Sequence, residues 1–362
     1  MDFHKTYHEE EKLYLAGPEC FYPDGRKKLQ SMKLLAESYG FGVSLPNDNK
    51  LDMSNEDVRK NADNIFENCA VSIDITTAIL VDLERFRGSE PDGGSIYELG
   101  MAYARGCRCY GYTRDLRPVY RKYDGAMLKD GVVYDRDDKE LAYPELPFSP
   151  NIIGSSKVIE GDLDDCLKLL MLDIKEERKA GITRTYLDEK PGPKNKKAKT
   201  IYLSLSNRYS ENKGAYEKLE ALAKEAGYKL VISAIPKKLA GIKDVYRQAA
   251  EIFAQNEKAV KDSDICLFDL NDYHGWEPNS DVAFEAGMAW QLGKKCFGFM
   301  GDNSNMRTRI PHYDDKLENR DWHGNDVENF NYPLNLMFSS SMPIFGGDVT
   351  AAFKQVLKHI SR

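Results

Sequence analysis

The chain has 362 residues, about twice the length of an ordinary α/β domain, and 41% of them are hydrophobic. That composition supports a sizeable core and excludes a disordered chain. The 51 lysines and arginines are outnumbered by 58 aspartates and glutamates, so the net charge of −7 argues against a nucleic-acid polymer as the main partner.

The composition also bears on location. The apolar runs are far shorter than the roughly 20 residues that span a bilayer, so we expect no membrane partner. The segment 1–12 lacks the apolar stretch of a secretory signal. Seven scattered cysteines without a C-x-x-C pair are typical of free thiols in the cytoplasm. Cys107 and Cys109 have no neighbouring histidine to complete a zinc set, so we predict a cytoplasmic protein without a metal.

Strands and helices alternate along the first half. The predicted strands cover 13–16, 41–45, 78–83 and 107–112. The predicted helices cover 25–39, 54 to about 72, 95–105 and 163–179, with Ser54 as the N-cap of the second. In the second half, helices are predicted near 211–226, 242–262, 281–292 and 348–360. Strands separated by helices form parallel sheets covered on both faces, so the fold class is α/β with two doubly wound domains.

The second half of the chain repeats the first. LYLAGP from Leu13 is matched by IYLSLS from Ile201. Three pairs of identical residues keep nearly the same separation, which is 188 residues for the tyrosines at 14 and 202, and 187 for the aspartates at 82 and 269 and the glutamates at 98 and 285. We therefore predict a tandem duplication, with domains at 1–186 and 201–362 and a linker at 187–200 that is rich in proline, glycine and lysine.

Acidic residues follow the third predicted strand of the first half. Ligands of doubly wound sheets bind at the carboxyl ends of the strands. Asp82 ends that strand, Asp92 lies in the loop behind it, and Glu98 lies within the next helix. Asp82 also suits a helix cap, and Asp92 suits a turn beside Pro91. Glu98 is harder to explain structurally, because the helix around it is apolar and a buried charge requires a partner or a chemical role.

Two nearby carboxylates suit a retaining transfer of a glycosyl group. One carboxylate attacks the sugar carbon as nucleophile, and a second carboxyl group protonates the leaving group. Glu98 lies early in its predicted helix, where we expect the helix dipole to favour the ionised form. The hydroxyl of Tyr14, in the first strand, can hold an oxygen of the nucleophile.

These segments resemble the nucleoside 2-deoxyribosyltransferase family. The likeness rests on LYLAGP, VDLERFRGSEPDGGSIYELGMA and the late N-L-M, and it extends over most of 12–175 and most of 200–361. The resemblance implies two flavodoxin-like domains that form a pseudo-dimer within one chain. It also implies transfer of 2-deoxyribose between nucleobases without a cofactor, with deoxynucleosides and free nucleobases as the partners.

The resemblance assigns roles in the first copy. Glu98 is expected as the nucleophile that forms a covalent glycosyl ester, and Tyr14 is expected to orient it. Asp82 and Asp92 are expected to handle the base and its proton. The substrate-binding loop residues are expected to be Gly17, Pro18 and Gly93.

The family completes each site with an asparagine and a methionine from a neighbouring subunit. Asn335 and Met337 of the second copy match that pair and are expected to complete the first site. The first copy offers Asn151, but Ile153 stands in place of the methionine. The second site, which we expect to be impaired, comprises Tyr202, Asp269, Asn279, Glu285 and Asn151.

Alternative functions stay open at this point. The same cluster suits a hydrolase of deoxynucleosides or deoxynucleoside 5′-monophosphates, with Gly17, Gly93 and Arg87 near a phosphate. A nucleoside- or nucleotide-binding sensor without turnover is a further alternative. The charged stretch 114–138 is predicted as a lid over the first site or as a surface excursion. A homo-oligomer, such as a trimer of tandem chains, is also compatible with the duplication.

Overall fold

A computed structural model describes residues 11–45, 51, 53–123, 125–136, 138–141, 143–187, 191, 199–206, 213–233, 244–314 and 319–361. Most of the predicted linker at 187–200 lies outside these residues. In the described part of the chain, no helix is both long and apolar enough to cross a membrane.

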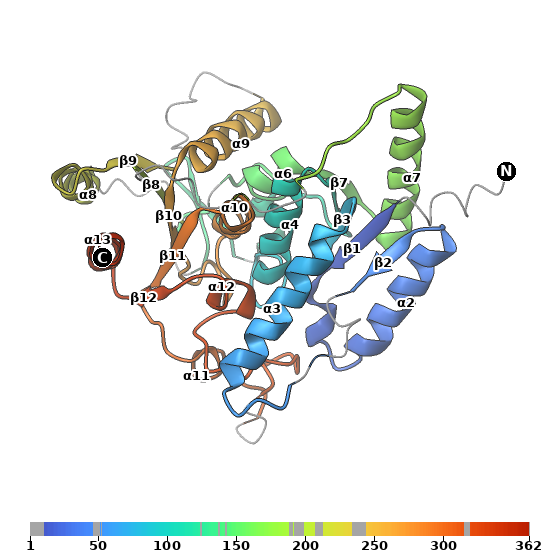
Figure 1. The fold of residues 1–362 in the computed structure, drawn as a ribbon, viewed down its shortest axis with the longest axis horizontal. Coiled ribbons are helices and arrows are strands. Elements are labelled where there is room, and N and C mark those ends of the chain that lie inside the picture. The colour runs from blue at the N-terminus through green and yellow to red at the C-terminus, as the bar shows by residue number, and fades with distance from the viewer. Residues whose placement is uncertain are drawn as a thin grey trace.

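The first half folds around a parallel five-stranded sheet (Figure 1). Its strands are β1 (Lys12–Ala16), β2 (Gly42–Ser44), β3 (Ala78–Asp82), β4 (Arg108–Thr113) and β7 (Lys157–Glu160), in the order β2-β1-β3-β4-β7. The main helices are α2 (Gly25–Ser38), α3 (Val58–Asp74), α4 (Gly93–Arg105) and α7 (Leu163–Lys179). Two short helices are η1 (Pro18–Phe21) and α6 (Pro150–Ser155).

The second half repeats this topology. Its strands are β8 (Thr200–Ser204), β9 (Lys229–Ile232), β10 (Ile265–Asp269), β11 (Lys295–Met300) and β12 (Ile344–Gly346), in the order β12-β11-β10-β8-β9. Its helices are α8 (Lys213–Glu225), α9 (Val245–Asp262), α10 (Ser280–Gln291), α12 (Leu336–Ser339) and α13 (Val349–Ile360). Numbered within each half, both sheets have the order 2-1-3-4-5 of flavodoxin-like folds, which confirms the predicted fold class.

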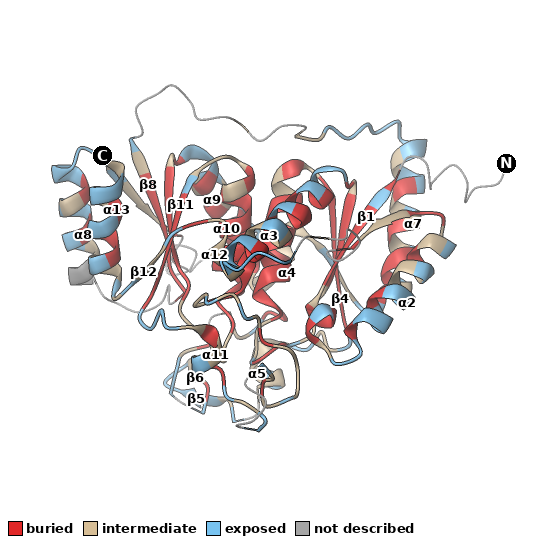
Figure 2. Cartoon of the chain, turned by 60° about the horizontal axis from the view of Figure 1, so that its bottom comes forward, coloured by how far each residue is buried: buried red, intermediate tan, exposed pale blue. Residues whose placement is uncertain are grey.

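An excursion leaves each half between its fourth and fifth strands. The first carries α5 (Val119–Lys122) and the hairpin β5 (Met127–Lys129) and β6 (Val132–Tyr134), and the second carries α11 (Met306–Arg309). Figure 2 shows both below the two sheets.

One helix begins later than predicted. Asp57, not Ser54, is the N-cap of α3, and its side chain accepts a hydrogen bond from the backbone nitrogen of Arg59 at 3.1 Å. Aspartate is as good an N-cap as serine, so the side chain nearer to the amphipathic run takes the role.

The two faces of the first sheet pack against different layers. Leu13 and Leu15 point to the outer layer, whose core includes α2 and α7, whereas Tyr14 and Ala16 point to the inner layer with α3 and α4. Alternation along a strand sends neighbouring side chains to opposite faces. Tyr14 therefore points toward helix α4, which carries Glu98.

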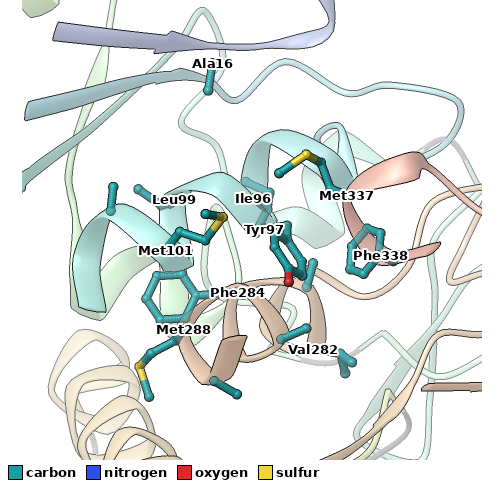
Figure 3. Close-up of a cluster of buried hydrophobic side chains, with 14 of the residues drawn as sticks. Ala16, Ile96, Tyr97, Leu99, Met101, Val282, Phe284, Met288, Met337 and Phe338 are labelled. Atoms are coloured by element: carbon teal, nitrogen blue, oxygen red, sulfur yellow. The ribbon is translucent and has the colours of Figure 1, made fainter. Parts of the chain in front are cut away.

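The inner layers of both halves merge into one core. Helices α4 and α10 cross at the middle of the molecule, where Figure 3 shows Phe284 and Met288 of α10 against α4. A side chain at Gly100 would lie 2.0 Å from the carbonyl oxygen of Phe284, and one at Gly287 would lie 1.9 Å from that of Tyr97. Only glycine permits this approach of the two backbones.

Each half also caps the inner helix of the other. Glu277 of the second half accepts a hydrogen bond from the backbone nitrogen of Gly93, which begins α4, at 3.1 Å. Glu90 of the first half accepts one from the backbone nitrogen of Ser280, which begins α10, at 3.0 Å. A carboxylate at a helix N-terminus binds free backbone donors and complements the dipole. The two halves therefore stabilise each other by reciprocal contacts.

Candidate active site

A cavity of about 260 Å³ lies beside Glu98 and is walled by both halves of the chain. The first half contributes the loop after β1, one side of α3 and the start of α4. The second half contributes a segment at 326–337. Phe21, Ile65, Val327, Phe330 and Met337 give the cavity apolar walls, and Asp92, Glu98, Glu328 and Asn335 add polar groups.

Tyr14 and Glu98 form a buried hydrogen-bonded pair. The Tyr14 hydroxyl donates to Oε1 of Glu98 at 2.6 Å, and Glu98 is 6% exposed. Strand β1 directs Tyr14 inward, and helix α4 brings Glu98 to meet it. The structure thus places these two predicted residues in direct contact at the cavity wall.

Burial raises the pKa of Glu98 to about 8, and the charge of Asp92 adds to this rise, while hydrogen bonds from Tyr14 and Cys69 lower it. Helix α4 begins at Gly93, so Glu98 lies in its second turn, where the effect of the helix dipole has already faded. The expectation that the ionised form is favoured at this position in the helix is therefore wrong. Desolvation dominates.

Asp92 is the N-cap of α4 and also borders the cavity. Its Oδ2 accepts hydrogen bonds from the backbone nitrogen and the hydroxyl of Ser95 at 2.8 and 2.6 Å. Its Oδ1 is buried and has no hydrogen-bond partner among the described residues. Burial raises the pKa of Asp92, an effect opposed by Ser95. One oxygen thus orients the carboxyl group, and the other is left for a ligand.

Asp82 faces a different opening. It borders an adjoining open cleft of about 520 Å³ together with Glu19. Its Oδ1 accepts a hydrogen bond from the backbone nitrogen of Glu84 at 2.8 Å. Burial raises the pKa of Glu19 to about 9, and the neighbouring charge of Asp82 adds to that rise. The structure therefore separates Asp82 from the wall that holds Asp92 and Glu98.

The predicted loop residues take different positions. Gly17 borders the cavity, and a side chain there would collide with the carboxyl group of Glu19. Pro18 is buried as the first residue of η1. The backbone nitrogen of Gly93 donates a hydrogen bond to Glu277 of the second half. Neither Pro18 nor Gly93 is among the described residues that line the cavity.

Asn335 and Met337 both line the cavity beside Glu98. Asn335 is the N-cap of α12, and its Oδ1 accepts a hydrogen bond from the backbone nitrogen of Met337 at 2.8 Å. Its amide packs against Gly94, where a side chain would approach the Asn335 nitrogen to 2.7 Å. Figure 3 shows Met337 above α4, close to Ile96. The absence of a side chain at Gly94 makes room for Asn335.

Arg87 anchors the second-half wall. Its guanidinium donates to Oδ2 of Asp321 at 3.1 Å and to the carbonyl oxygen of Asp326 at 2.6 Å, and it lies 3.6 Å from Oε1 of Glu277. Arg87 is buried and stacks on Phe86. Its charge is thus engaged in holding the segment that closes the cavity, and it does not line the cavity as a phosphate site requires.

The equivalent glutamate of the second half is enclosed by protein groups. Glu285 is 1% exposed. Its Oε2 accepts hydrogen bonds from the hydroxyls of Tyr202 and Ser204 at 2.9 and 2.5 Å, and its Oε1 accepts one from the amide of Asn151 at 2.9 Å. The Glu285 carboxylate is therefore hydrogen-bonded by three protein donors. Its counterpart in the first half, Glu98, faces a cavity.

Asp281 replaces Gly94 at the matching position of the second half and binds the matching asparagine. Its Oδ1 accepts a hydrogen bond from the backbone nitrogen of Asn151 at 2.8 Å, and its carbonyl oxygen accepts one from the Asn151 amide at 3.0 Å. Asn279 caps α10, with Oδ1 accepting from the backbone nitrogen of Asp281 at 2.9 Å.

The side chain of Asp269 is hydrogen-bonded to residues of the second half. Its Oδ2 accepts from the hydroxyl of Ser206 at 2.5 Å, and its Oδ1 accepts from the amide of Asn271 at 2.6 Å. The carboxyl groups of the second cluster thus accept hydrogen bonds from protein donors on both oxygens of Asp269 and Glu285, whereas Oδ1 of Asp92 in the first cluster has no partner among the described residues.

The stretch 114–138 does not cover the first site. Asp135 pairs with His274 at 2.6 Å, and the hydroxyl of Tyr123 donates to the His274 carbonyl oxygen at 3.2 Å. Next to these residues, only about 40 Å³ of space remains beside Asn279. The prediction of a lid over the first site is wrong, because this excursion crosses to the second half.

Comparison with known proteins identifies the family. A model of the nucleoside 2-deoxyribosyltransferase family matches residues 13–144 and again residues 201–337. The chain belongs to this family. Each matched region covers the first four strands of one sheet, and the two matches support the tandem duplication.

Two solved structures show weaker likenesses. A 2-desoxiribosyltransferase from Leishmania mexicana is 27% identical with a TM-score of 0.36, over 44% of this chain and 98% of that chain. The glycosyltransferase SnogD from Streptomyces nogalater is 9% identical with a TM-score of 0.20, over 80% of this chain and 81% of that chain. No curated protein sequence matches this chain.

Several neighbours of the deoxyribosyltransferase-like site escape sequence reasoning. Glu328 and Phe330 lie in an excursion without a regular pattern, and their approach to Glu98 depends on how the two halves pack. Ser204 stands where the first copy has Ala16, so a comparison of the two copies reveals the change but not its partner, Glu285. Cys69 lies on the apolar face of α3, where a thiol is read as part of the core.

Proposed function

We propose that this chain transfers 2-deoxyribose between nucleobases at the first site, by a retaining mechanism through a glycosyl ester on Glu98. The observation that carries the proposal is the Tyr14–Glu98 pair at the wall of a cavity that both halves enclose. Family membership supports action on nucleosides. The apolar walls suit a flat base, and the polar groups suit the sugar and the base edge.

The first half-reaction forms the ester. An ionised oxygen of Glu98 attacks C1′ of the deoxynucleoside, and the bond between C1′ and the base nitrogen breaks. The electron pair of that bond goes to the base, which takes a proton from the carboxyl group of Asp92. Tyr14 holds Oε1 of Glu98, so the carboxylate keeps one orientation during the attack.

The second half-reaction transfers the sugar from Glu98 to the acceptor base. A ring nitrogen of the acceptor base attacks C1′ from the face that the first base left, and the ester bond breaks. The proton of that nitrogen returns to Asp92, and the Glu98 carboxylate is restored. Two inversions at C1′ give net retention. Asn335 and Met337 act here as second-half residues that position the substrate.

We propose further that the second site does not turn over. A nucleophile must approach the sugar carbon, whereas the Glu285 carboxylate accepts three hydrogen bonds from Tyr202, Ser204 and Asn151. The space near Asn279, about 40 Å³, is far smaller than the cavity of about 260 Å³ beside Glu98. The second half then serves to complete the first site.

The test is base exchange in a mixture of deoxyinosine and adenine, followed by chromatography. We expect deoxyadenosine from the wild-type protein. Glu98→Gln should lower the rate by at least a thousandfold, because an amide is a very poor nucleophile. Glu285→Gln, the matched control in the second half, should keep most of the activity. Loss of turnover in Glu285→Gln with activity left in Glu98→Gln would contradict the assignment of the sites.

The same assay separates the alternatives. Free deoxyribose without a new nucleoside would indicate a hydrolase. Binding of deoxyinosine without any product would indicate a sensor. Arg87 is paired with Asp321 and is not among the residues that line the cavity, which argues against the phosphate-binding role considered for it.

A further inference from the structure

The cavity beside Glu98 receives a carboxyl group from each half of the chain. Asp92 comes from the start of α4, and Glu328 comes from the segment before α12. Oε2 of Glu328 accepts a hydrogen bond from the backbone nitrogen of Leu336 at 2.8 Å, which orients the side chain. Oδ1 of Asp92 is buried without a partner among the described residues. The two acids thus present polar atoms to the same enclosed space.

Glu328 is suited to act as both donor and acceptor. Burial raises its pKa to about 8, against the hydrogen bond from Leu336 and the charge of Arg87, and the charge of nearby Asp92 adds to the rise. At neutral pH the carboxyl group is therefore mostly protonated. A neutral carboxyl group offers an O–H donor beside a carbonyl acceptor, the arrangement that matches a ring nitrogen next to an amino group.

Apolar side chains share the cavity wall with Glu328. Val327 precedes it and Phe330 follows two residues later, and Phe21 and Ile65 line the cavity from the first half. An aromatic ring enclosed by such walls gains affinity from its faces, and its polar edge then decides specificity.

The acids of the corresponding space beside α10 are bound by protein groups. Asn279 replaces Asp92 there, and the acids that border the space are Glu90 and Asp281. Glu90 accepts a hydrogen bond from the backbone nitrogen of Ser280, and Asp281 accepts one from the backbone nitrogen of Asn151. In the first site, by contrast, Oδ1 of Asp92 has no partner among the described residues.

We propose that Glu328 hydrogen-bonds the edge of the nucleobase and determines which bases the first site accepts, favouring a ring nitrogen adjacent to an exocyclic amino group. This inference rests on the proposed function of the same site. It assigns to the second half a residue that contacts substrate, in addition to Asn335 and Met337.

The experiment compares adenine with unsubstituted purine, which lacks the amino group, as acceptors with deoxyinosine as donor. Wild-type protein should prefer adenine by at least tenfold in kcat/KM. Glu328→Leu should remove most of that preference by weakening the use of adenine while changing the use of purine little. Glu328→Gln keeps a donor and an acceptor and should keep the preference. Glu225→Leu, on the exposed surface of α8, is the control.

A purely structural role predicts a different result. If Glu328 only holds the backbone at Leu336, Glu328→Leu should lower kcat/KM for adenine and purine by the same factor, and that outcome would overturn the inference. The pH profile adds a second criterion. The KM for adenine should rise above about pH 8 in the wild type, as Glu328 loses its proton, and should not rise in Glu328→Gln.

Calorimetric titration with free adenine separates this inference from the proposed function. If the wild type transfers no sugar but binds adenine, and Glu328→Leu binds it at least tenfold more weakly, the base contact stands and the transferase proposal fails. If the wild type transfers sugar and Glu328→Leu keeps its base preference, the inference about Glu328 fails alone.

Discussion

At the scale of single residues, the Tyr14–Glu98 hydrogen bond controls the charge of the proposed nucleophile. Burial raises the pKa of Glu98 to about 8, and Tyr14 lowers it. Glu98 must be ionised to attack, so kcat/KM should rise with pH through about 8. Tyr14→Phe removes a donor to the carboxylate and should move this rise upward by about one pH unit, equal to ~1.4 kcal/mol. Initial rates across pH 6–10 measure the shift, and an unchanged profile would contradict this role of Tyr14.

The difference between what is predictable and what is not is clearest for single residues. Glu98 stands out in the sequence because a charge interrupts an apolar helix, and the structure gives it a partner in Tyr14. Asp82 follows the same pattern at a strand end, but its side chain turns to the Glu84 backbone and to Glu19. Spacing along a chain predicts which loop holds an acid. The side-chain direction depends on local hydrogen bonds, which spacing does not encode.

At the scale of elements, the starts of α4 and α10 differ in several side chains, and we attribute the difference between the two sites to one of them. Gly94 leaves room for Asn335, whereas Asp281 binds Asn151. Gly94→Asp should therefore drive a carboxylate into Asn335 and lower base exchange by at least a hundredfold. Gln30→Asp, on the exposed surface of α2, tests whether the added charge alone matters. Thermal unfolding should show both variants folded, and an active Gly94→Asp would contradict this explanation of the asymmetry.

The sequence predicts the bounds of a helix well where its hydrophobic pattern continues over several turns. The closing helix of the first half matches its predicted range, Leu163–Lys179, because an acidic N-cap and a basic last turn bound it on both sides. For the stretch 114–138 the sequence leaves two alternatives, a lid over the first site and a surface excursion, and it does not predict the contact with the second half that the structure shows. The destination of this stretch depends on the contact between Asp135 and His274, which are 139 residues apart, and a local pattern carries no information about such a pairing.

At the scale of the whole molecule, one chain holds two copies, but the residues that the structure describes enclose a single open cavity beside a tyrosine–glutamate pair. We therefore expect one glycosyl group per chain. Protein mixed with excess deoxyinosine and quenched in acid should gain the mass of one deoxyribosyl group, and peptide mapping should place it on Glu98. The Glu98→Gln variant should gain none. Two groups per chain, or a label on Glu285, would show that the second site also forms an ester.

The crossing of α4 and α10 at Gly100 and Gly287 has a consequence for how such a protein can change. In a homodimer, every substitution appears on both sides of the twofold axis, so a buried aspartate that suits one side is imposed on the other. Here the related positions are encoded separately. Asp281 stands at the position that corresponds to Gly94, although the helices that carry the two residues meet through equivalent glycines. A chain that carries both halves can therefore keep the shape of this interface while each half varies without the other.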